Sequence, residues 1–121
     1  MDERFHEGIR EFNRGYFFEA HDILEDLWHE YRESDRLFLQ GLIQVAVGYY
    51  HFENRNFKGA RSQFSKACAK LEPYQPVHQN LFIGELLVSV KGCLEVVAKA
   101  ERGEAVEFEK IEIPKIRYTN Q

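Results

Sequence analysis

The residue types that could do chemistry gather in one stretch of the chain. His21 and Glu25 are four residues apart, which places both side chains on one face of a helix, one turn apart. A histidine beside a carboxylate can work as an acid–base pair or contribute ligands to a metal ion. Further along, Gln40, Gln44 and His51 fall on one helical stripe. With Trp28, which follows on the edge of His21 and Glu25, these residues form a candidate site that we call the polar cluster: His21, Glu25, Trp28, Gln40, Gln44 and His51.

The polar cluster requires two helices that pack side by side. A helix is expected over residues 16–32 and another over 35–54, and the break between them is short enough to predict antiparallel packing. Folding the chain about residues 33 and 34 brings Gln44 near both His21 and Glu25. His51 then lies roughly 7–8 Å from His21 along the axis, at about 1.5 Å per residue.

Three interpretations of the polar cluster follow. The favoured one is structural: buried polar side chains satisfy one another and fix which helix faces which, since unpaired buried polar groups are costly. In the second, the cluster is a small-molecule or catalytic pocket, with His21 as acid, base or ligand and Glu25 orienting it. The third is a metal site of His21, Glu25 and His51, which that axial distance would strain. No catalytic residue is assigned and no cofactor is expected, because no nucleophile beside a base and no glycine-rich phosphate loop is recognisable.

The remaining elements follow from periodicity and stop signals. Helices are predicted over residues 2–14, 57–72 and 78–102, in addition to the two above. Gly15 is the natural left-handed end of the first helix, and Asn56 suits the N-cap of the fourth. The third helix is apolar almost all round and should be buried. In the fifth, Leu81, Val88 and Val96 lie off the main stripe and should be covered by the tail or by a second subunit.

These elements predict an all-α, single-domain bundle of about five helices over residues 1–103. Residues 104–121 are predicted to be an extended C-terminal tail, which could include one short strand and which packs on the bundle or on a partner subunit. A chain of 121 residues suffices for one core.

Charge and composition exclude several classes of protein. The net charge of −4 leaves no basic footprint for nucleic acid and no polybasic membrane patch. Without a signal-like N-terminus or an apolar span, a cytoplasmic location is expected. Cys68 and Cys93 are expected to be buried free thiols. The remaining histidines are expected to be isolated surface residues: His6, His29 and His78.

Three motifs in order resemble a known family. They are His21-Asp-Ile-Leu-Glu25-Asp-Leu-Trp28, Gln40-Gly-Leu-Ile-Gln44-Val-Ala46 and Asn56-Phe-Lys-Gly59-Ala60, and they look like the signature of domain-of-unknown-function family 309 over about residues 9–72. The resemblance implies a small helical protein, mainly prokaryotic, of no established activity. It also implies that the polar cluster is one shared group. The family pattern often has glycine where Arg55 stands, so a different turn is expected there.

The function expected from the sequence is that of a non-enzymatic interaction or scaffold module. Surplus apolar surface on the third and fifth helices favours a homo-oligomer, and a protein partner is also compatible with it. The alternative is a small-molecule-binding protein, or a metal-dependent or other enzyme, that uses His21, Glu25, Gln44 and His51.

Overall fold

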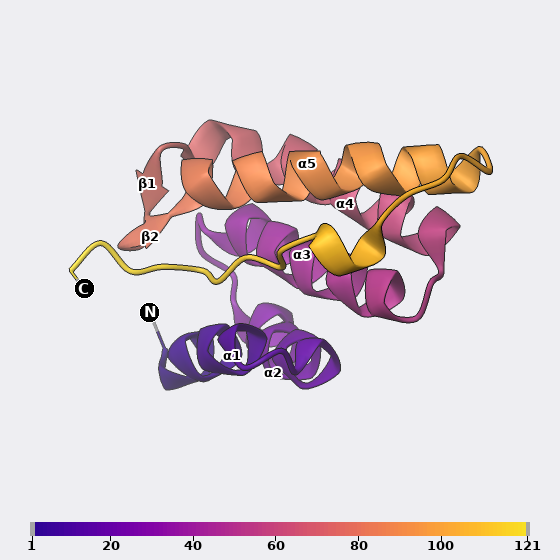
Figure 1. The fold of residues 1–121 in the computed structure, drawn as a ribbon. Coiled ribbons are helices and arrows are strands. Elements are labelled where there is room, and N and C mark those ends of the chain that lie inside the picture. The colour runs from indigo at the N-terminus through magenta and orange to yellow at the C-terminus, as the bar shows by residue number, and fades with distance from the viewer. Residues whose placement is uncertain (1, 121) are drawn as a thin grey trace.

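The computed structural model describes residues 2–120 and confirms the all-α class. Five helices follow one another: α1 (Glu3–Asn13), α2 (Phe17–Glu30), α3 (Arg36–Glu53), α4 (Phe57–Leu71) and α5 (Ile83–Glu101). Each helix packs on the next along the chain. Figure 1 shows α3 in the middle, with α1 and α2 on one side of it and α4 and α5 on the other. No helix among the described residues is long and apolar enough to span a membrane.

The helix ends follow the local signals in the sequence. Gly15 has φ +85°, the left-handed conformation that closes α1. Asn56 caps α4, since its side chain accepts a hydrogen bond from the Gly59 backbone N–H at 3.0 Å. Arg55 has φ +58°, so the turn keeps the left-handed geometry that a glycine would supply.

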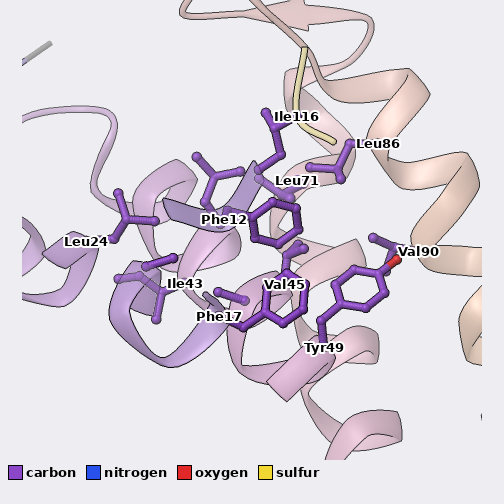
Figure 2. Close-up of a cluster of buried hydrophobic side chains, with 14 of the residues drawn as sticks. Phe12, Phe17, Leu24, Ile43, Val45, Tyr49, Leu71, Leu86, Val90 and Ile116 are labelled. Atoms are coloured by element: carbon purple, nitrogen blue, oxygen red, sulfur yellow. The ribbon is translucent and has the colours of Figure 1, made fainter. Parts of the chain in front are cut away.

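The core is built around α3, which contacts α2 on one side and α4 on the other. Glycine permits the close approach to α4, because a Cβ on Gly48 would lie 2.5 Å from the Phe64 ring. Tyr49 is fully buried at the centre of an aromatic cluster, with its ring centroid 4.8 Å from that of Phe64 and 5.7 Å from that of Phe17. Figure 2 shows the Tyr49 hydroxyl directed towards Val90 of α5.

The segment before α5 is a small hairpin, which corrects the predicted start of the fifth helix. Strands β1 (Val77–His78) and β2 (Leu81–Phe82) pair antiparallel, with His78 opposite Leu81. The two turn residues, Gln79 and Asn80, have φ +50° and +60°, as the tight turn of a two-residue hairpin requires. The helix therefore begins at residue 83 instead of 78.

The hairpin also brings together a second group of polar side chains, Asp35, His78 and Gln79, which the sequence did not predict. Asp35 is buried at the start of α3, where it accepts hydrogen bonds from His78 Nε2 at 2.8 Å and from the Gln79 amide. The His78 ring also packs on Phe38 and Tyr74, with centroids 4.6 and 4.7 Å away. His78 is therefore not an isolated surface residue.

The tail lies along the bundle and crosses in front of α3 in Figure 1. Ile116 is buried, and its backbone N–H and C=O both bond to the Asn13 side chain of α1. Tyr118 forms an isolated bridge with Leu81, so the tail covers Leu81. Regular structure in the tail is limited to a 3₁₀ turn (Phe108–Lys110) among the described residues. Val88 stays 74% exposed, so the tail does not cover it, and cover by a second subunit stays a prediction.

The two cysteines are free thiols of unequal depth. Cys93 is buried in α5, whereas Cys68 in α4 is partly buried. Burial raises the pKa of the Cys93 thiol to about 12 and also raises the pKa of Cys68. Both thiols are therefore weaker nucleophiles than an exposed cysteine, and Cys93 is the weaker of the two.

Candidate functional site

Five of the six members of the polar cluster line one open pocket of about 300 Å³. The walls are α2 and α4, and α3 forms the floor. The polar lining consists of His21, Glu25 and Trp28 from α2, Gln40 and Gln44 from α3, and Gln63 from α4. Ile43 and Val47 complete the floor with apolar surface. The short connection after α2 produces this arrangement, because it folds α3 back along α2 in the register estimated from the sequence.

His21 and Glu25 are the two ionisable side chains of the pocket. The His21 Nε2 atom lies 3.3 Å from Glu25 Oε2, as expected for two residues one helical turn apart. His29 approaches the same carboxylate from the other side, with 3.9 Å between Nε2 and Oε1. The Glu25 side chain is 44% exposed, so it lines the pocket and also contacts bulk solvent.

Two polar atoms of the pocket residues are buried without a hydrogen-bond partner. They are the Trp28 Nε1–H, a donor, and the Gln44 Oε1, an acceptor. The outer face of the Trp28 indole is covered by the Arg36 guanidinium, 3.8 Å from the ring centroid. An unpaired buried donor or acceptor costs about 1–3 kcal/mol. These two atoms are therefore not satisfied by the other members of the polar cluster.

His51 is the member that the structure places outside this pocket. It lies in a neighbouring slot of about 130 Å³, which shares His21 and Val47 with the pocket and adds Phe18 and Tyr50. Its Nδ1 lies 3.2 Å from the Asn56 amide nitrogen, and Asn56 in turn caps α4. Through this contact, His51 helps to hold the turn between α3 and α4.

The metal hypothesis finds no geometric support. Within residues 2–120, no three His, Cys, Asp or Glu side chains come together as a group that could hold a metal ion. His21 and Glu25 are adjacent, but His51 is engaged with Asn56. Among the described residues, His21, Glu25 and His51 therefore do not form a three-ligand group.

Sequence reasoning missed Gln63. The predicted register covered only the second and third helices, whereas Gln63 enters from α4. A signal was present: Gln63 adjoins the inward-facing row of Ala60, Phe64 and Ala67, so it lies on the border that faces α3.

Comparison with known proteins adds a family and one relative. Residues 5–63 match the family described as Domain of unknown function (DUF309). The uncharacterized protein YpuF of Bacillus subtilis (strain 168) is 31% identical over 88 residues, which are 68% of this chain and 51% of that protein. The chain thus spans about half the length of this relative. The matched family region includes α2, α3 and Gln63, and so every residue of the pocket.

Proposed function

Since residues 5–63 belong to domain-of-unknown-function family 309, whose description assigns no activity, we propose a function from the geometry of the pocket. The chain is a non-enzymatic binding protein whose pocket between α2, α3 and α4 receives a small, uncharged ligand rich in hydrogen-bonding groups. The observation that carries this proposal is the pair of unpartnered buried atoms, Trp28 Nε1 and Gln44 Oε1, on residues that line an open pocket.

The ligand class follows from the lining. The amides of Gln40, Gln44 and Gln63 each offer donors and an acceptor, and Glu25 adds an acceptor. A primary amide, a nucleobase or a sugar presents matching donor and acceptor groups. The apolar floor of Ile43 and Val47 suits the flat or carbon-bearing face of such a ligand.

Binding is favoured over catalysis by what surrounds His21. The pocket lining contains Glu25, three glutamines and Trp28, but no serine, threonine or cysteine that His21 could activate. A cytoplasmic location and a partner chain belong to the proposal as well. The opposite charges of α2 and α4 favour a protein partner.

The first test replaces Gln44 by Leu and measures the free energy of unfolding. If the amide is kept for a ligand, the apolar side chain should stabilise the free protein by about 1 kcal/mol, because an unpaired buried acceptor disappears. Gln75→Leu, at an exposed position outside the pocket, is the control. A loss of stability in Gln44→Leu would show that the amide is part of a structural network and would contradict the proposal.

The second test uses Trp28, the single tryptophan of the chain, as a reporter in the pocket itself. Acetamide, adenine, uracil and glucose are titrated while the indole emission is recorded. We expect at least one of these probes to change the emission of the parent protein saturably, and Gln44→Leu to weaken that response at least tenfold. If none of the four probes changes the indole emission, the proposed ligand class is wrong.

A further inference from the structure

The two helices that form the walls of the pocket carry opposite charges. The acidic side chains of α2 are Glu19, Asp22, Glu25, Asp26 and Glu30, and this helix carries no lysine or arginine. The basic side chains of α4 are Lys58, Arg61, Lys66 and Lys70, and this helix carries no acid. The pocket therefore lies between an acidic helix and a basic one.

Four of these charges lie close to pocket residues along their own helices, on the side of the molecule where the pocket opens. Asp22 and Asp26 each follow directly after a pocket residue of α2 and are exposed. On α4, Lys66 and Lys70 continue the row of Gln63 at helical spacing, and the Cβ of Lys70 lies against Gly41 of α3. Within residues 2–120, none of these four side chains has an ion-pair partner, whereas Glu30 pairs with Arg4 and Arg61 with Glu101.

The helix registers place these charges at matching heights. The rings of Phe18 and Tyr50 are 5.6 Å apart, which fixes α2 against α3. The close approach of Gly48 to Phe64 fixes α3 against α4. Neighbouring helices among α2, α3 and α4 run antiparallel, so α2 and α4 run parallel. At 1.5 Å per residue, these two contacts place Asp22 at the same height along the helix axes as Lys66, and Asp26 at the same height as Lys70.

We propose that a second copy of this chain docks on this face, about a two-fold axis that runs along α3. Such a rotation exchanges the two walls, so that α2 of each protomer covers α4 of its partner. It places Asp22 against the partner's Lys66 and Asp26 against the partner's Lys70, and the symmetry forms each pair twice. The other two-fold arrangement, with the axis across α3, would set acid against acid and base against base.

The outward-facing stripe of α3, which is partly buried except at Leu37, runs along this axis. Leu37, Gln40, Gln44, Val47 and His51 recur at alternating spacings of three and four, the repeat that lets two helices pack along a seam. Leu37 is 58% exposed and would lie beside the partner's Leu37. The two pockets would face each other across the axis, although the docking rests on the charges and not on the proposed ligand.

The test is a charge exchange followed by sedimentation equilibrium of the full chain. The parent protein should sediment as a dimer of the 14.3 kDa chain and dissociate as salt rises. The acid-wall variant Asp22→Lys/Asp26→Lys and the base-wall variant Lys66→Glu/Lys70→Glu should each be monomeric. Mixed in equal amounts they should form a heterodimer, because both interfaces then regain opposite charges.

A matched control keeps the same change of net charge away from the face. Glu95→Lys/Glu109→Lys, at exposed positions on α5 and the tail, should remain dimeric. A parent protein that stays monomeric at every concentration, single-wall variants that remain dimers, or a mixture that stays monomeric would each overturn the proposal. Because Asp22, Asp26 and Lys66 are exposed and Lys70 is only partly buried, far-ultraviolet circular dichroism should show unchanged helix content in every variant.

A second measurement tests the direction of the axis without altering the charges. Leu37→Cys should become cross-linked between protomers by a short bis-maleimide, because the two-fold axis brings both copies of residue 37 together. Val88→Cys should not become cross-linked, although Val88 on α5 is more exposed than Leu37 (74% against 58%). Cross-linking of Val88→Cys instead of Leu37→Cys would overturn the proposed face. Neither result depends on whether the pocket binds acetamide or the other probes.

Discussion

The Tyr49 hydroxyl offers a sharp test of the core. Tyr49 is fully buried, its hydroxyl has no hydrogen-bond partner, and Figure 2 shows it among apolar side chains near Val90. Burying a hydroxyl without a partner costs about 1–3 kcal/mol. Tyr49→Phe removes this cost and leaves a void of one oxygen atom, which costs a few tenths of a kcal/mol at about 24 cal/mol per Å³. We therefore expect a net stabilisation of about 1–2 kcal/mol.

The assay is urea unfolding, with calorimetry as a second measurement. A gain of that size corresponds to a rise in Tm of about 4–8 °C for a chain of this length. Tyr50→Phe is the matched control, because Tyr50 is the next residue but is 38% exposed, so its hydroxyl is solvated and its loss should be neutral. If Tyr49→Phe loses 1 kcal/mol or more, the hydroxyl is hydrogen-bonded, and the reasoning is refuted.

The pH dependence of the same variant has a definite sign. Burial raises the pKa of Tyr49 above its usual value of 10. Below pH 10 both the folded and the unfolded states keep the proton, so stability is unaffected. Above pH 10 only the unfolded state releases it, and the parent protein loses up to about 1.4 kcal/mol per pH unit from this residue. The advantage of Tyr49→Phe should therefore grow between pH 10 and 11, and a constant difference would contradict the assignment.

Three further outcomes are expected. Arg55→Ala should lower the free energy of unfolding by about 1 kcal/mol, because it keeps the left-handed φ of +58° and removes the guanidinium that lies 4.5 Å from the Phe108 ring centroid. Arg55→Gly should be closer in stability to the parent protein, because glycine adopts a positive φ without strain. Urea unfolding of the two variants tests this difference. Asp35→Ala should lose about 1–3 kcal/mol in the same assay, because the imidazole and the amide that it accepts from are left without their acceptor. With Ellman's reagent at pH 8, Cys68 should react before Cys93, and a faster Cys93 would contradict their order of burial.

The first four helices were predictable because each is bounded by a local signal. Gly15 and Asn56 act through their own backbone and side chain, and these effects can be read from sequence alone. The start of the fifth helix was missed by five residues, because the turn at Gln79 and Asn80 depends on two positive φ angles that helical periodicity does not report.

The same contrast holds at the site. A register drawn for two adjacent helices sufficed to bring His21, Glu25 and Gln44 to one place, because a short connection leaves little freedom. The place of Gln63 in the pocket depends on how α4 packs against α3. That packing follows from the close contacts at Gly41 and Gly48, which cannot be read from the sequence. Whether the pocket binds a ligand stays a prediction.

The contact between α1 and the tail has a consequence for how the chain is made. Two hydrogen bonds join the Asn13 side chain to Ile116, 103 residues away. Because synthesis proceeds from the N-terminus, α1 exists long before the segment that completes its surroundings. Contacts so distant in sequence form late and slowly. We expect the nascent chain to expose the apolar surface around α1, and to remain a substrate for chaperones, until residue 116 has been added.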